Sequence, residues 1–164
     1  MELKLPAPCI VVLIGPSSSG KTTWAREHFE GNEVVSSDSL RSMVGVDEDD
    51  QRASKPAFEI LEKVVDERMD RRLTTVIDTT GLNEKNRKSW ISRAHDADLP
   101  IYAAVMETPP DECERRNAER SRPLPKATRG SRSRNSTMWS RDSKRRVSTA
   151  SSVSNPLRRY LPSW

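Results

Sequence analysis

One eight-residue segment limits the fold of this chain more than any other. Residues 15–22 read Gly-Pro-Ser-Ser-Ser-Gly-Lys-Thr, which matches the pattern G-x-x-x-x-G-K-[ST], and an apolar run at 9–14 directly precedes them. The glycines let successive backbone N–H groups converge on an anion, and the following helix adds the positive end of its dipole. A chance Lys-Thr turn is the alternative. The apolar run before the segment and the helical pattern at 23–29 favour a phosphate-binding loop.

The residues of this loop have distinct expected roles. Lys21 is expected to reach the β- and γ-phosphates of a nucleotide, and the Thr22 hydroxyl to bind Mg²⁺. Further contacts to the phosphates are expected from Gly15, Ser17, Ser18, Ser19, Gly20 and Thr23. We therefore expect ATP or another NTP, together with Mg²⁺, as the cofactors.

Charge divides the chain into two parts. Residues 1–120 carry 17 Lys/Arg and 23 Asp/Glu, whereas residues 121–164 carry 11 Lys/Arg and one acid. The second part is rich in Ser and Arg and has no sustained apolar period, which is typical of poorly ordered chain. We predict one domain at 1–122 and a basic, poorly ordered tail at 123–164.

The sequence also restricts where the protein works. It has no run of about 18 apolar residues, and its first residues lack the pattern of a signal peptide. We expect a cytoplasmic protein without a membrane partner, and the sequence leaves the oligomeric state open.

Apolar strand-like runs alternate with helical patterns in the first 120 residues. Strands are expected at 9–14, 33–36, 74–78 and 101–106. Amphipathic helices are expected at 56–73 and at 83–94, the second with Asn83 as its N-cap. This alternation predicts an α/β fold of the P-loop NTPase type, in which right-handed βαβ units form a parallel sheet flanked by helices. Ligands of such folds bind at the carboxyl ends of the strands.

Two aspartates follow expected strands at this edge. Asp38 is placed to accept a proton from an attacking hydroxyl, and Arg41 to bind a substrate phosphate. Asp38 could equally be the N-cap of the next helix. Asp78 closes the third apolar strand and is expected to order Mg²⁺ with Thr22, although such a residue can also cap a turn. Arg87, on the helix after Asp78, faces either solvent or substrate.

Several segments in order resemble the kinase module of bacterial polynucleotide kinase-phosphatase, a family of P-loop 5′-OH polynucleotide kinases. The resemblance covers residues 8–122 and is carried by 15–23, 34–41, 47–51, 76–83 with Arg87, and 113–120. It implies transfer of the γ-phosphate of an NTP to the 5′-hydroxyl of RNA or DNA during end healing.

The resemblance also assigns roles to single residues. It implies that Asp38 activates the 5′-hydroxyl, that Arg41 holds the neighbouring nucleotide, and that Arg116 and Arg120 belong to a lid over the phosphates. The charged segment around these arginines could instead be a solvated helix face with i,i+4 ion pairs.

The chain departs from the family pattern in two places. Gly81 stands where relatives often have Asn, and the resemblance stops at 122–125. The tail is either an altered gene end, which would not supply a closing strand for the sheet, or a basic arm that binds RNA. Two other functions stay open: a toxin-like P-loop kinase for a small molecule or a sugar nucleotide, and a non-catalytic NTP-binding protein.

Overall fold

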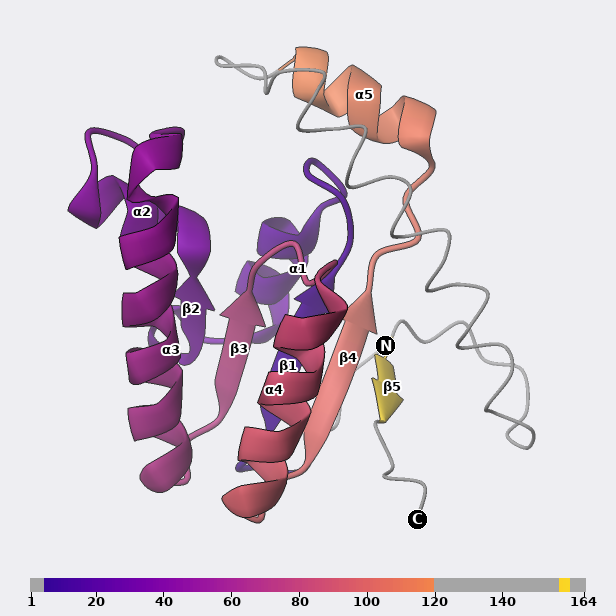
Figure 1. Cartoon of the computed structure of the whole chain (residues 1–164). Coiled ribbons are helices and arrows are strands. Elements are labelled where there is room, and N and C mark those ends of the chain that lie inside the picture. The colour runs from indigo at the N-terminus through magenta and orange to yellow at the C-terminus, as the bar shows by residue number, and fades with distance from the viewer. Residues whose placement is uncertain (1–4, 120–156, 160–164) are drawn as a thin grey trace, which may run out of the picture.

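A five-stranded sheet runs through the computed structural model, which describes residues 5–119 and 157–159 (Figure 1). Its strand order is β2-β3-β1-β4-β5. The strands are β1 (Ile10–Ile14), β2 (Val34–Ser36), β3 (Thr75–Asp78), β4 (Ile101–Val105) and β5 (Leu157–Arg159). The first four are parallel to their neighbours, and β5 runs antiparallel to β4. The order places β1, which leads into the phosphate-binding loop, in the middle.

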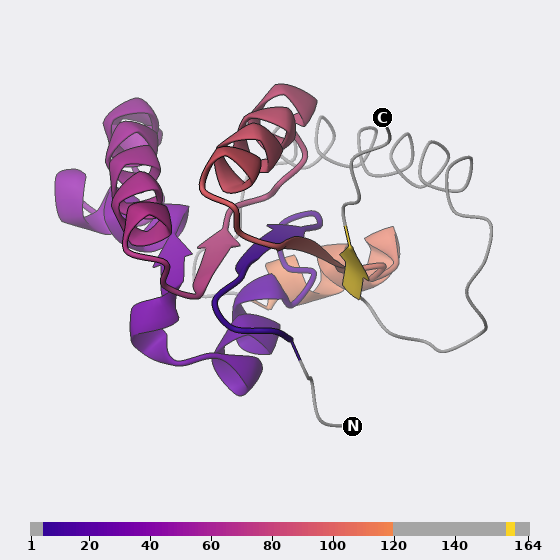
Figure 2. The same cartoon turned by 90° about the horizontal axis from the view of Figure 1, so that it is seen from below.

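Helices cover both faces of this sheet. The longest, α3 (Ser54–Asp70), and α4 (Glu84–Asp96) lie on one face, and α1 (Lys21–His28) lies on the other (Figures 1 and 2). The five residues of β1 are all buried, because every side chain of a sheet covered on both faces points into a core. The loop after β1 therefore begins from a rigid part of the molecule.

Three shorter helices lie near the end of the sheet where the site forms. They are α2 (Ser37–Val44), η2 (Gln51–Ala53) and α5 (Pro110–Ala118), whereas η1 (Gly31–Glu33) leads into the start of β2. Figure 1 shows α5 beyond the carboxyl ends of β1 and β4, and α2 beside the end of β2. The carboxyl edge of the sheet thus has one helix on each side.

The structure confirms the predicted fold class. Each of the four expected strands is present within one residue at either end, and both amphipathic helices are present with boundaries shifted by one to three residues. Asn83 caps α4, since its side chain accepts hydrogen bonds from the N–H groups of Lys85 and Asn86. None of the described helices is long and apolar enough to cross a membrane.

One strand comes from the basic tail. β5 pairs with β4 through the partners Leu157 and Ala104, Arg158 and Ala103, and Arg159 and Tyr102. An altered gene end is expected to supply no closing strand for the sheet. The structure instead has a three-residue strand from the tail, which pairs with β4. The rest of the tail, 120–156 and 160–164, lies outside the described residues, and the division at residue 122 stays a prediction.

Candidate active site

A cavity of about 840 Å³ opens at the carboxyl edge of the sheet. One wall is formed by the phosphate-binding loop, the start of α1 and Arg116 of α5. The opposite wall is formed by α2, the segment that joins it to α3, the start of α3 and the start of α4. The cavity therefore connects every motif that the sequence placed at this edge.

The phosphate-binding loop closes on itself around Lys21. Gly20 has a φ of +92° and is the N-cap of α1, a backbone conformation that L side chains rarely adopt. The Lys21 ammonium is buried and donates to the carbonyl oxygens of Gly15, at 3.0 Å, and Pro16, at 2.7 Å. A positive charge is thus held inside the loop.

Two hydroxyl groups of the loop show that it fits an anion. The Oγ atoms of Ser18 and Ser19 are buried and have no hydrogen-bond partner among the described residues. A buried polar group without a partner costs about 1–3 kcal/mol. Phosphate oxygens would accept hydrogen bonds from both hydroxyls, so the loop has the chemistry of a phosphate site.

Thr22 and Asp78 meet beside this loop. The Thr22 hydroxyl donates to Asp78 Oδ2 at 2.9 Å, which joins the start of α1 to the end of β3. Burial raises the pKa of Asp78, and this rise is opposed by the Thr22 hydrogen bond and the charge of Lys21. A contact between distant segments argues against a purely local turn-capping role for Asp78.

A hydroxyl and a carboxylate are ligands that Mg²⁺ accepts. No group of three or more His, Cys, Asp or Glu in the described chain could hold a metal by itself. Mg²⁺ usually takes one or two protein oxygens and completes its shell with water and substrate phosphates. Thr22 and Asp78 therefore fit Mg²⁺ that arrives with a nucleotide.

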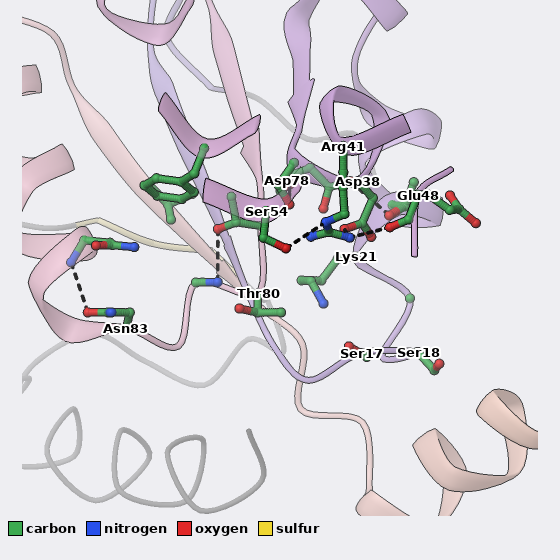
Figure 3. Close-up of a pocket in the computed structure, with 18 of the residues that line it drawn as sticks. Ser17, Ser18, Lys21, Asp38, Arg41, Glu48, Ser54, Asp78, Thr80 and Asn83 are labelled. Carbon is green, nitrogen blue, oxygen red and sulfur yellow. Dashed lines mark hydrogen bonds and ion pairs between the residues drawn. The ribbon is translucent and has the colours of Figure 1, made fainter. Parts of the chain in front are cut away.

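Asp38 and Arg41 lie on the opposite wall as an ion pair. Arg41 Nη1 is 3.0 Å from Asp38 Oδ1, and Arg41 Nε donates to Ser54 Oγ at 3.2 Å. The same Nη1 donates to the backbone oxygen of Glu48 (Figure 3). The Arg41 side chain is only 13% exposed and the Asp38 side chain is 58% exposed. A fixed guanidinium thus stands beside an accessible carboxylate.

The capping alternative for Asp38 is wrong. The N-cap of α2 is Ser36, whose side chain accepts from the N–H of Ser39, and Asp38 is the second residue of the helix. Asp38 therefore does not cap this helix, and its carboxylate faces Arg41 and the cavity (Figure 3).

Arg87 and Gly81 also line the cavity. Arg87 lines the cavity, is 7% exposed and donates to the Gly81 oxygen at 2.7 Å. Gly81 has a φ of +60°, and a Cβ there would lie 2.3 Å from the Leu13 oxygen. The departure at position 81 therefore has a structural reason, since this backbone packs directly on the end of β1. The role of Arg87 in binding substrate stays a prediction.

Helix α5 brings Arg116 over the loop. Arg116 Nη1 lies 3.5 Å from the position that a Cβ on Gly20 would take, and the Thr108 hydroxyl donates to the Ser19 oxygen at 2.8 Å. The solvated-face alternative stays open, because Arg115 is 60% exposed and paired with Glu112 and Glu119, and Arg116 is 44% exposed and paired with Glu112. Arg120 lies outside the described residues.

Sequence reasoning missed Ser54 and the Glu48 carbonyl, which hold Arg41. It also missed Phe58 and Trp90, which line the cavity and have ring centroids 6.3 Å apart. A serine at a helix start and an aromatic on an apolar face carry no signal of their own. Only the packing of α3 beside α2 and α4 identifies these residues.

Comparison with solved structures shows which folds resemble this one. A chain in the Pnkp1/Rnl/Hen1 RNA repair complex matches with a TM-score of 0.70 and 20% identity, over 85% of this chain and 47% of that one. A second structure of the Pnkp1/Rnl/Hen1 complex matches with a TM-score of 0.57 and 21% identity, over 71% of this chain and 41% of that one. A proposed kinase from Chloroflexus aurantiacus matches with a TM-score of 0.60 and 14% identity, over 71% of this chain and 69% of that one.

These matches confirm the P-loop kinase-like fold and the resemblance found in the sequence. This chain spans about half the length of the chain that it matches in the RNA repair complex. No relative was found among the curated proteins. Residues 10–142 match the AAA domain family, which is most of the chain and includes the loop, both aspartates and α5. The chain therefore belongs to the AAA domain family and has the fold of a P-loop kinase.

Proposed function

We propose that this chain is an NTP-dependent kinase that transfers the γ-phosphate to the 5′-hydroxyl end of a nucleic acid. One observation carries the proposal: the Asp38–Arg41 pair, held at 3.0 Å, lines the same cavity as the phosphate-binding loop. A phosphate donor and a hydroxyl acceptor that enter from opposite walls would meet there, and such positioning is a large part of phosphoryl-transfer catalysis.

The donor side contains the groups that bind a triphosphate. Lys21 would pair with the β- and γ-phosphates, and the buried hydroxyls of Ser18 and Ser19 would donate to phosphate oxygens. Thr22 and Asp78 would hold Mg²⁺, which when bound neutralises charge on the phosphates. Arg116 would stabilise charge that develops on the transferring phosphoryl group.

The acceptor side contains a base and a phosphate ligand. The 5′-hydroxyl oxygen would attack the γ-phosphorus while its proton passes to the Asp38 carboxylate. The bond from the γ-phosphorus to the β,γ-bridging oxygen would break, and the nucleoside diphosphate would leave. Arg41, fixed by Ser54 and Glu48, would bind the phosphate that follows the first nucleoside. The end of a nucleic acid offers both groups, since its 5′-hydroxyl and the next phosphate are separated by one nucleoside.

The fold comparisons support the proposal without identifying the acceptor. A similar chain belongs to a complex described as acting in RNA repair, and another is a proposed kinase. Both similarities lie at or below 20% identity, so support for the proposed acceptor comes from the residues that line the cavity.

A second acceptor class has one observation in its favour. Glu48 and Asp49 line the acceptor side, and carboxylates there repel a phosphate backbone while attracting a cation. A small alcohol that carries an amine is therefore the second candidate.

Transfer of labelled phosphate from γ-³²P-ATP to a set of acceptors tests the proposal. The set contains 5′-hydroxyl RNA and DNA, the same oligonucleotides already 5′-phosphorylated as matched controls, nucleosides and amino-alcohols. We expect label only on the 5′-hydroxyl oligonucleotides and none with Lys21→Ala, whereas Lys88→Ala on the exposed side of α4 should behave like wild type. Label on small alcohols alone would establish the second candidate. ATP binding without transfer to any acceptor would indicate a non-catalytic protein.

A further inference from the structure

Four charged side chains form a continuous line along α5, the helix beyond the end of β4 (Figure 1). Glu119 accepts from Arg115 Nη1 at 2.9 Å, and Arg115 binds Glu112 through Nε and Nη2 at 2.7–3.1 Å. Glu112 Oε1 also accepts from Arg116 Nε at 2.8 Å. The line ends at Arg116, which lines the cavity and is 44% exposed.

Exposure decreases along this line toward Glu112. The side chains of Glu119 and Arg115 are 61% and 60% exposed, and that of Glu112 is 28% exposed. Hydrogen bonds from Arg115 and Arg116 lower the pKa of Glu112, so its carboxylate stays charged at neutral pH. Isolated surface ion pairs contribute little to stability, but a bidentate pair within a network has a fixed geometry.

We propose that Glu112 is a positioning residue, which binds the Nε edge of Arg116 and so directs the other edge of that guanidinium toward the γ-phosphate. The proposal rests on the proposed kinase function, but only on the binding of the nucleotide that donates the phosphate. Arg115 binds Glu112 and is itself paired with Glu119, and neither Arg115 nor Glu119 is among the residues that line the cavity.

The geometry of arginine gives the physical reason. A guanidinium is a rigid planar fork, so a hydrogen bond to Nε fixes the direction of the two terminal nitrogens. In this structure Nη1 lies 3.5 Å from the position that a Cβ on Gly20 would take, where the phosphate-binding loop meets α1. A donor that is fixed before the reaction needs no reorganisation when charge develops on the phosphoryl group. Glu112 would thus act on catalysis through Arg116 and would not touch the nucleotide.

The test compares binding of ADP with binding of ADP plus aluminium fluoride, which mimics the transferring phosphoryl group, both in Mg²⁺. We expect Glu112→Ala to weaken the fluoride-dependent gain in affinity by about tenfold, less than the 10²–10³ lost on removal of a direct transition-state donor, while ADP alone binds as in wild type. Glu112→Gln keeps an acceptor oxygen for Nε and should retain most of the gain. Glu119→Ala, which breaks only the outer pair with Arg115, is the matched control and should resemble wild type.

A double-mutant cycle separates positioning from a general structural effect. In an Arg116→Ala background, Glu112→Ala should cause no further loss, because the residue through which it acts is gone. An undiminished loss in that background, or no loss in the single variant, would overturn the inference. A larger fluoride-dependent gain in Glu112→Ala would also overturn it, since Glu112 would then be holding Arg116 away from the phosphate.

The readout uses no acceptor, so it distinguishes this inference from the proposed function. If wild type phosphorylates a small alcohol in place of a 5′-hydroxyl end, the acceptor proposal fails and the role of Glu112 is unaffected. If wild type does not bind ADP, both fail together.

Discussion

At the scale of single residues, the site places two carboxylates in opposite environments. Asp38 is 58% exposed and paired with Arg41, whereas Asp78 is 5% exposed and accepts a hydrogen bond from Thr22. An accessible carboxylate suits proton transfer with an incoming substrate, and a buried one suits metal binding in a fixed geometry.

Asp38→Asn should remove the base and leave the donor site intact. We expect ATP affinity like that of wild type and a transfer rate lower by about 10² to 10⁴, the usual contribution of a general base. Single-turnover rates and nucleotide affinity measure the two effects. Asp70→Asn is the control, because Asp70 is an exposed carboxylate at the end of α3 and is not among the residues that line the cavity. Full activity of Asp38→Asn would place the base elsewhere.

Asp78 makes the stability of the nucleotide-free protein depend on pH. Burial raises its pKa above the ordinary 3.8, so the folded protein binds this proton more tightly than the unfolded chain does. The resulting stabilisation is complete below the unfolded pKa and is lost as pH rises through the folded pKa. Asp78→Asn carries no charge at any pH, and its amide oxygen can still accept from Thr22.

We therefore expect the melting temperature of Asp78→Asn, measured relative to that of wild type at the same pH, to increase as pH rises from below 3.8 to 7. The same variant should bind ADP with little response to Mg²⁺. Asp96→Asn, at the exposed end of α4, serves as the control and should show no such trend. A pH-independent difference for Asp78→Asn would show that burial of the charge costs nothing.

At the scale of elements, the segment that joins β3 to α4 contacts the phosphate-binding loop. The Gly15 N–H donates to the Thr80 oxygen at 3.1 Å, and Arg87 binds the next residue's oxygen at 2.7 Å. Two backbones approach so closely here that Gly81 has room for no side chain. The geometry of the loop thus depends on an element remote from it in sequence.

Gly81→Ala should destabilise the protein strongly. A left-handed non-glycine residue costs about 1–3 kcal/mol, and the clash with the Leu13 oxygen adds to that cost. Gly31→Ala is the matched control, because no atom lies within 4 Å of a Cβ built there. Urea denaturation measures both variants. Equal midpoints for the two would show that the close approach at Gly81 is readily relaxed.

At the scale of the whole molecule, charge and site are separated along the chain. Among residues 5–119 and 157–159, those that line the cavity lie between 12 and 116, and this part of the chain is acidic overall. The basic tail contributes β5 to the far edge of the sheet, beside β4. The described part of the tail thus lies at the edge of β4 and is not among the residues that line the cavity.

A chain that ends at Arg122 tests this division. We expect it to bind ADP as tightly as the full chain and to melt at a lower temperature, because β4 loses its partner strand. Calorimetry and thermal unfolding measure the two properties. Lost ADP binding would show that the tail completes the site. A less steep salt dependence of nucleic-acid binding would identify the tail as an arm that neutralises phosphates.

The sequence by itself determined the features that depend on local patterns. The glycine-lysine motif after an apolar run predicted the loop, and alternating strand and helix periods predicted the parallel sheet. Since parallel strands share a carboxyl edge, the positions of Asp38 and Asp78 after two expected strands were enough to assign both to one site.

Tertiary structure decided what depends on contacts between distant segments. The cap of α2 is Ser36 and not Asp38, Arg41 is held by Ser54 and a backbone oxygen, and Gly81 packs on Leu13. Several serines and aspartates near a helix start have the same capping preference, and a hydrogen bond across the fold leaves no periodic trace in the chain. The packing of α2, α3 and α4 around the sheet edge decides which of these competing contacts has the lower free energy.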